Sequence, residues 1–128
     1  MIDRPQYYEK IEPFIDKPFI KVITGVRRCG KSTMMLLIQQ LLIKRGINKN
    51  QIIAINFESM SYYDLRDYHS LYNYITKAVQ KIEGKVYLFF DEVQIVEKWE
   101  EAINSFLIDF PSDIYITGSN SQLLSSEL

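Results

Sequence analysis

Short apolar runs alternate along the chain with longer segments in which apolar residues recur every three or four positions. The short runs are rich in β-branched and aromatic residues, a composition typical of buried strands. They predict strands over residues 19–24, 51–57, 85–90 and 113–117. Because these runs show little polar alternation, they favour a parallel sheet covered by helices on both faces, that is, a three-layer α/β/α fold.

The longer segments predict the covering helices. These span residues 5–12, 31–45 and 70–83, with a further helix that begins near Trp99 and ends before Pro111. We expect Ser70 to cap the third helix at its N-terminus. The middle of the second helix, residues 34–43, is apolar on nearly every side, which indicates a helix covered from two directions.

Composition narrows the class of protein. The 128 residues are 47% hydrophobic and 13% aromatic, which suits one folded domain and excludes disorder as the main state. The net charge of −1 differs from that of a globally basic nucleic-acid binder, although a local basic patch stays open. The single cysteine cannot form an internal disulfide, and no apolar run is long enough to span a bilayer. We therefore expect a cytoplasmic protein that does not associate with membranes.

The first predicted strand and the second predicted helix are joined by GVRRCGKS, residues 25–32, which matches the phosphate-binding pattern G-x-x-x-x-G-K-[ST]. Gly25 and Gly30 allow the backbone to wrap around a phosphate, and the helix that follows directs its positive end at the same place. We predict that Lys31 contacts the β- and γ-phosphates and that the Ser32 hydroxyl reaches Mg²⁺. The alternative is a glycine-rich turn with no ligand; the flanking strand and helix argue against it.

A second motif, VYLFFDE, spans residues 86–92. We expect Asp91 to hold the metal at the carboxyl end of the strand, and Glu92 to orient and deprotonate a water that attacks the γ-phosphate. A solvated loop at a strand end is the alternative. A glutamate directly after the aspartate favours ATPases that have an extra strand between the phosphate-loop strand and the metal strand, rather than GTPases or nucleotide kinases.

Weaker candidates surround these motifs. Thr117, Ser119 or Asn120 could hold the attacking water, and Asn120 is our catalytic candidate; a turn and helix cap is the alternative. Arg28 and Cys29 are included among the nucleotide-binding residues, the alternatives being a solvated arginine and a small loop-filling residue. For Asn56 and Glu58 an ordinary loop role is favoured over a contact with Glu92. Five tyrosines could stack on nucleobases, but packing or a partner surface is favoured; they are Tyr62, Tyr63, Tyr68, Tyr72 and Tyr74.

In order, RRCGKST, INFES, LFFDEVQ and ITGSNSQLLSSEL resemble the bacterial and archaeal AAA-type ATPases whose core precedes a C-terminal domain similar to restriction endonucleases. The resemblance covers nearly the whole chain. It implies ATP and Mg²⁺ as cofactors, phosphate and metal binding by the loop through Thr33, Asp91 as the metal acid and Glu92 as the base. It also implies that residues 1–128 are the N-terminal fragment of a longer ATPase core. The strand order would be 5-1-4-3-2 with strand 5 missing, and a lid, an arginine and an effector domain would follow.

The leading hypothesis is an ATP-binding core that, in the full-length protein, hydrolyses ATP with Mg²⁺ to drive or gate a partner domain. The alternative is a nucleotide-gated switch or assembly module without meaningful turnover. A small-molecule phosphotransferase is a weaker hypothesis, because the sequence shows neither an acceptor pocket nor a lid. A homo-oligomer and a nucleic-acid partner both stay open.

Overall fold

The computed structural model describes residue 13, residue 15, residues 20–23 and residues 30–118. Within these residues, four parallel strands form one sheet in the order β1-β4-β3-β2. The strands are β1 (Lys21–Ile23), β2 (Ile52–Asn56), β3 (Val86–Asp91) and β4 (Ser112–Thr117). The predicted order of strands 1, 4, 3 and 2 is confirmed, with β4 lying between β1 and β3.

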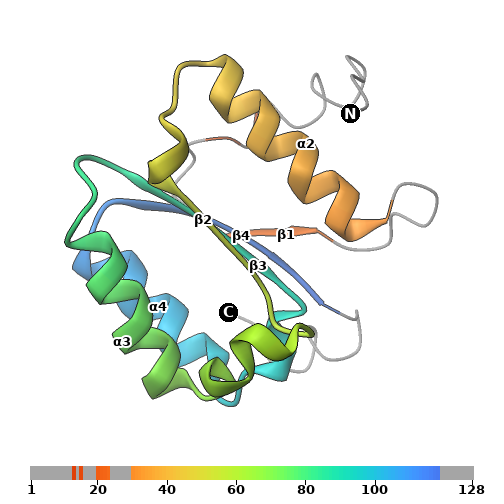
Figure 1. The fold of residues 1–128 in the computed structure, drawn as a ribbon, viewed down its shortest axis with the longest axis vertical. Coiled ribbons are helices and arrows are strands. Elements are labelled where there is room, and N and C mark those ends of the chain that lie inside the picture. Colours follow the sequence, from red (N-terminus) through yellow and green to blue (C-terminus); the bar gives the residue numbers. More distant parts are fainter. Residues whose placement is uncertain (1–12, 14, 16–19, 24–29, 119–128) are drawn as a thin grey trace.

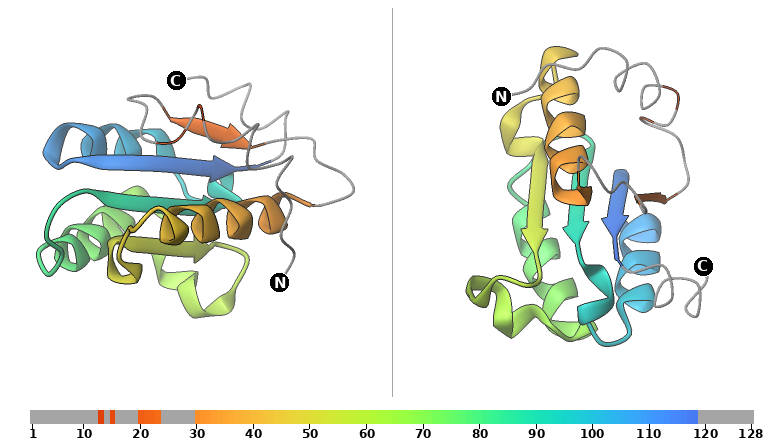
Figure 2. Two further views of the ribbon diagram at one scale, coloured as in Figure 1. Left: turned by 90° about the horizontal axis from the view of Figure 1, so that it is seen from above. Right: turned by 90° about the vertical axis from the view of Figure 1, so that its right-hand side faces the viewer.

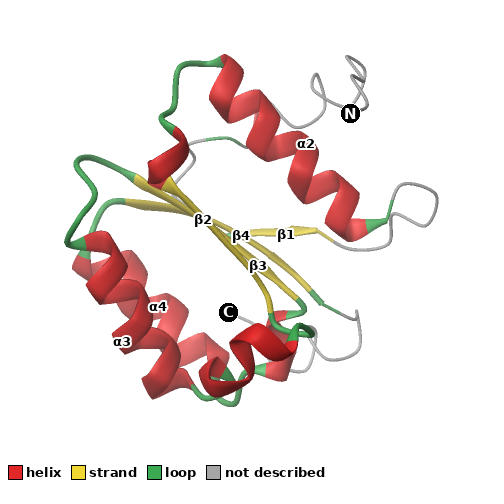
Figure 3. Ribbon diagram, viewed as in Figure 1, coloured by secondary structure: helices red, strands yellow, loops and turns green. Residues whose placement is uncertain are grey.

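Helices cover both faces of this sheet (Figure 1). The α-helices are α2 (Lys31–Lys44), α3 (Tyr68–Val79) and α4 (Trp99–Asp109). Short 3₁₀ helices are η2 (Lys49–Gln51), η3 (Met60–Leu65) and η4 (Val93–Ile95). Helix α2 lies on one face, and α3 and α4 lie on the other (Figure 3), which confirms the three-layer fold. None of the helices in the described ranges has the length and apolar character needed to cross a membrane.

The central strand β3 is buried along its whole length, because its side chains point alternately into two cores. Val86, Leu88 and Phe90 pack in the core beneath α3 and α4. Tyr87 and Phe89 pack in the core beneath α2. The continuous apolar run that predicted a strand buried on both faces therefore has a direct structural counterpart.

The sheet covers one side of α2. Met35, Ile38 and Leu42 pack against the sheet, whereas Leu36 is 45% exposed and Ile43 is 42% exposed. The expectation that the apolar helix is covered from two directions therefore does not hold for these two side chains.

The N-terminus of α3 differs from the prediction. The helix begins at Tyr68, and its cap is Asp67, whose side chain accepts a hydrogen bond from the backbone N–H of Ser70 at 3.0 Å. Ser70 is thus the donor of the capping bond rather than the cap. The predicted helix over residues 5–12 lies outside the described residues.

All four strands end at the same edge of the sheet, and α2 begins at that edge (Figure 2). The register places Ile23 beside Thr117, and Asn56 beside Asp91. Phe90 pairs with Ile116, so the next residues of those strands, Asp91 and Thr117, are also neighbours. Carboxyl ends of parallel strands are where open α/β sheets hold ligands.

Candidate nucleotide site

Asp91 is the last residue of β3 and is only 8% exposed. Its backbone carbonyl accepts a hydrogen bond from the Phe57 N–H at 3.1 Å, which fixes it to the end of β2. Its side-chain Oδ1 accepts a hydrogen bond from the Thr117 hydroxyl at 2.5 Å. Asp91 is therefore held at the predicted edge of the sheet from both sides, through its backbone next to β2 and through its carboxylate next to β4.

Glu92 turns the chain away from the sheet. It adopts the left-handed backbone conformation, with φ 58° and ψ 52°, which few residues other than glycine adopt. Its N–H donates to the Thr117 Oγ1 at 2.9 Å, and its carbonyl accepts from the Ile95 N–H at 3.2 Å. These bonds stabilise the uncommon conformation, which directs Glu92 differently from an extension of β3.

Gln94 contacts the carboxylate of Glu92. Its Nε2 donates to Glu92 Oε1 at 2.8 Å, while its own Oε1 is buried without a hydrogen-bond partner. The amide orientation follows from this contact, because the opposite assignment would place two oxygens against each other. Gln94 therefore restrains the glutamate carboxylate and leaves a buried acceptor beside it.

Gly30 precedes α2 with φ 76° and ψ 153°, a conformation that essentially only glycine adopts. Its carbonyl accepts from the Met34 N–H at 3.2 Å and so begins the helix. The first turn of α2 contains no acidic residue. The positive end of the helix dipole is therefore not offset by a carboxylate within that turn, as an anion site requires.

Several predicted site residues cannot be placed. Gly25, Arg28, Cys29 and Asn120 lie outside the described residues. Lys31 and Ser32 are the first two residues of α2, but their side chains lie outside the described part. Thr33 follows them in the same turn and is partly buried. The start of α2, preceded by Gly30, and the end of β3, with Asp91 and Glu92, thus lie at the same edge of the sheet.

Asn56 and Glu58 form a loop contact, as favoured. Asn56 Oδ1 accepts a hydrogen bond from the Glu58 N–H at 3.0 Å.

Among the tyrosines, Tyr62, Tyr68 and Tyr72 pack against the core beneath α3 and α4. The favoured packing role is therefore confirmed for these three.

Two residues at the site have roles that the sequence did not indicate. Thr117 was considered as a water-holding residue, whereas its hydroxyl joins Asp91 to the backbone of Glu92. The sequence signal for the contact between Asp91 and Thr117 is that each residue lies at the carboxyl end of its predicted strand. Gln94 carried no comparable signal, since its contact depends on the left-handed turn at Glu92.

Two described groups with a shifted pKa are Asp67, the N-cap of α3, and Tyr72 within that helix. The backbone N–H of Ser70 holds the pKa of Asp67 below its ordinary value of 3.8. The hydrogen bond that the Tyr72 hydroxyl donates to Asp109 at 2.6 Å raises the pKa of Tyr72 above its ordinary value of 10.0, and burial adds to the effect. These shifts report a helix cap and an α3–α4 contact.

The residues at the edge fit a magnesium ion that is shared with a phosphate. Among the described residues, no group of three or more His, Cys, Asp or Glu side chains could hold a metal. Mg²⁺ in phosphate-transfer sites needs only one or two protein ligands, because waters and phosphate oxygens supply the rest. Asp91 offers the hard oxygen donor that this arrangement requires.

Comparison with known proteins finds two relatives of this chain. An uncharacterized protein from Haemophilus influenzae is 40% identical over 128 residues, which cover 100% of this chain and 32% of the relative. An uncharacterized protein from Methanocaldococcus jannaschii is 38% identical over 109 residues, which cover 85% of this chain and 23% of the relative. The chain therefore spans about a third and about a quarter of these two relatives.

A family described as an AAA domain matches residues 17–128, which include both sequence motifs and all four strands. The family indicates a nucleotide-binding, ATPase-type function. Because the match covers most of the sequence, the chain belongs to the AAA domain family.

Proposed function

We propose that the chain binds ATP and Mg²⁺ at the carboxyl edge of its sheet and that it forms the hydrolytic core of an ATPase. The observation that carries this proposal is the placement of Asp91 and Glu92 at that edge, held there by Thr117, where α2 also begins behind Gly30. A phosphate group, a metal ion and a base have to meet in one place for hydrolysis, and this edge offers a candidate for each.

Phosphate binding is assigned to residues 25–33. The positive φ of Gly30 and the helix that follows it support a loop whose N–H groups converge on an anion. In our proposal Gly25, Arg28 and Cys29 line the same loop. Lys31 adds a positive charge at the β- and γ-phosphates.

Metal binding is assigned to Asp91 and Ser32. These two residues would hold Mg²⁺, which would supply charge stabilisation for the phosphoryl group during hydrolysis. Asp91 would hold the ion through its hydration shell, and the bond from Thr117, which restrains the carboxylate, supports this role. Ser32 would supply the hydroxyl ligand.

Glu92 is assigned as the general base. Its backbone N–H is held by Thr117 and its carboxylate by Gln94, so the base is positioned before the substrate arrives. Such a carboxylate would accept a proton from a water aligned with the γ-phosphate. Asn120, which follows β4 in the sequence, is the candidate that would hold this water.

In the whole protein, we propose that this ATPase cycle drives or gates a partner domain. The relatives are three to four times as long as the aligned chain, which supports further domains in proteins of this kind. A helical lid, an arginine that contacts the nucleotide, and self-association into a homo-oligomer belong to the same proposal.

The test is a pair of measurements on Glu92→Gln: ATP affinity by calorimetry and single-turnover hydrolysis with Mg²⁺. We expect affinity within about twofold of the unsubstituted chain and hydrolysis slowed about 100-fold or more, because the amide cannot accept the proton. Glu83→Gln, at an exposed position beyond α3, is the matched control and should change neither value. Unchanged hydrolysis in Glu92→Gln would contradict the assignment of the base.

A second candidate function is a nucleotide-gated switch or assembly module without meaningful turnover. The observation in its favour is the exposure of Leu36 and Ile43 on α2, the helix whose first turn belongs to the proposed phosphate site. A partner that covers these side chains would be coupled to the nucleotide through the helix. Sedimentation with and without Mg²⁺-ATP distinguishes the two functions, since an unchanged mass and shape would count against the switch.

A further inference from the structure

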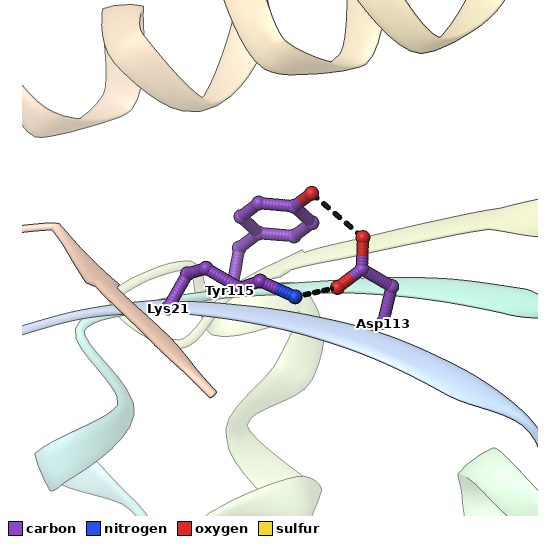
Figure 4. A network of polar contacts seen from close by, with 3 residues as sticks. All are labelled: Lys21, Asp113 and Tyr115. Carbon is purple, nitrogen blue, oxygen red and sulfur yellow. Dashed lines mark hydrogen bonds and ion pairs between the residues drawn. The ribbon is translucent and has the colours of Figure 1, made fainter. Parts of the chain in front are cut away.

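A buried polar network joins β1 to β4 on the face of the sheet that α2 covers (Figure 4). Lys21 and Asp113 form an ion pair, and the hydroxyl of Tyr115 donates to the other carboxylate oxygen, Asp113 Oδ2, at 2.7 Å. The Lys21 ammonium lies 5.3 Å from the centroid of the Tyr115 ring. Lys21 is 6% exposed and Asp113 is 1% exposed, so both charges lie inside the protein.

Burying this pair costs desolvation free energy that a pair of apolar side chains would avoid. A well-attested use of such a pair is to select one register among several that packing alone would allow. The pair spans the two strands diagonally: Lys21 is paired in register with Tyr115, and Asp113 lies two residues earlier on the same face.

The apolar residues of β1 specify its register weakly. Val22 is 50% exposed and Ile23 is only partly buried. A slip of two residues would keep each side chain on its own face of the sheet, so the two-residue periodicity does not oppose it. A two-residue slip toward the carboxyl end of β4 would move β1 by about 6.6 Å, place Lys21 beside Thr117 and break its buried ion pair with Asp113. The opposite slip would place Lys21 beside Asp113, so the pair opposes slippage in the first direction.

The register of β1 matters at the other end of the strand. Ile23 lies beside Thr117, and residues 24–29 connect it to Gly30 at the start of α2. A displaced β1 would therefore displace the loop that follows it relative to Asp91. We propose that the Lys21–Asp113–Tyr115 network keeps β1 from slipping toward the carboxyl end of β4 and thereby helps to position the phosphate loop. The loop-positioning part rests on the proposed function; the register part does not.

The test replaces the pair by apolar residues, in the double variant Lys21→Met with Asp113→Leu. Apolar replacement of a buried ion pair usually preserves stability, so we expect a melting temperature within a few degrees of the unsubstituted chain. Lys21→Met alone breaks the buried ion pair from one side and should lower the melting temperature by about 10–20 °C. The first readout is the set of backbone nuclear Overhauser effects between β1 and β4, which reports the register directly.

We expect the double variant to lose the unique set of β1–β4 contacts and to bind Mg²⁺-ATP about 10- to 100-fold more weakly, because the loop is displaced. Lys21→Arg keeps the positive charge and should retain both the β1–β4 contacts and the affinity for Mg²⁺-ATP. Lys85→Met is the matched control: this lysine also lies near a tyrosine ring, 5.9 Å from the centroid of Tyr87, but precedes β3. It should leave register and affinity unchanged.

The two readouts separate the possible failures. A double variant that keeps the single observed register would overturn the inference, whatever the nucleotide data show. A changed register with unchanged ATP affinity would overturn its loop-positioning part. If the unsubstituted chain fails to bind ATP, the proposed function is wrong, and the register contacts alone decide the role of the network.

Discussion

The hydroxyl of Thr117 donates a hydrogen bond to the carboxylate of Asp91 over 2.5 Å, from the end of β4 to the end of β3. The same oxygen accepts the N–H of Glu92 at 2.9 Å. One side chain, fully buried, thus orients the proposed metal acid and the backbone of the proposed base. These hydrogen bonds join β3 and β4 at the edge of the sheet where we propose that ATP is hydrolysed.

Replacing Thr117 by valine should destabilise the fold. The substitution keeps the shape of the side chain but removes its hydrogen bonds to the buried Asp91 carboxylate and to the Glu92 N–H, so we expect the free energy of unfolding to fall by about 1–3 kcal/mol. Urea denaturation measures this change. Thr117→Ser keeps the hydroxyl and should retain most of the lost stability; a valine variant as stable as the unsubstituted chain would show that the hydroxyl is dispensable.

Replacing Gln94 by methionine should impair hydrolysis rather than binding. The variant keeps the volume of the side chain and loses the donor to Glu92 Oε1, so we expect kcat to fall about tenfold or more with ATP affinity within about twofold. Gln80→Met, at the C-cap of α3, is the control. A variant that raises KM and leaves kcat unchanged would indicate that Gln94 acts in nucleotide binding.

Much of the fold follows from local pattern. The apolar runs predicted all four strands, most clearly β3 and β4, whose residues are nearly all buried on both faces. The third strand ends one residue later than expected, at Asp91. The cap of α3 was misassigned because Asp67 and Ser70 are both good capping residues, and only the geometry shows which one accepts the bond.

The site was predictable only where a motif fixes a residue to a strand end or a helix start. Asp91 and Gly30 are of this kind. The hydrogen bond between Gln94 and Glu92 depends on the left-handed backbone conformation of Glu92. Glutamate rarely adopts this conformation, so the sequence does not predict it. The Lys21–Asp113 pair was not anticipated, because a lysine and an aspartate in short strands give no sign that both are buried.

The stability contributed by Asp67 should depend on pH in the acidic range. The folded pKa lies below the ordinary 3.8, so the contribution is complete above that value and is lost as the pH falls through the folded pKa. Asp67→Asn keeps a capping oxygen that does not titrate. Melting temperatures should therefore show an advantage of the unsubstituted chain at pH 7 that disappears toward pH 2, and a difference that is constant with pH would contradict this origin.

The stability contributed by the hydrogen bond from Tyr72 to Asp109 should depend on pH in the opposite sense, in the alkaline range. Its folded pKa lies above 10.0, so the bond to Asp109 stabilises the fold below that pH and is lost as the pH rises through the folded value. The ring stacks on Phe106 with centroids 5.9 Å apart, and Tyr72→Phe preserves that contact. The difference in tyrosinate absorbance between the unsubstituted chain and Tyr72→Phe reports the titration of Tyr72, which should occur above pH 10. Tyr74→Phe, which removes an exposed tyrosine, is the control for the same difference measurement.

The most direct measurement of the central claim is a calorimetric titration of the chain with ATP in the presence of Mg²⁺, repeated with Lys31→Ala. Lys44→Ala, at the other end of α2, is the matched control. We predict saturable binding of one ATP per chain, weakened about tenfold or more in Lys31→Ala and unchanged in Lys44→Ala, because only Lys31 lies in the phosphate-binding pattern. Absence of saturable binding, or equal affinity in Lys31→Ala, would contradict a nucleotide site at this edge of the sheet.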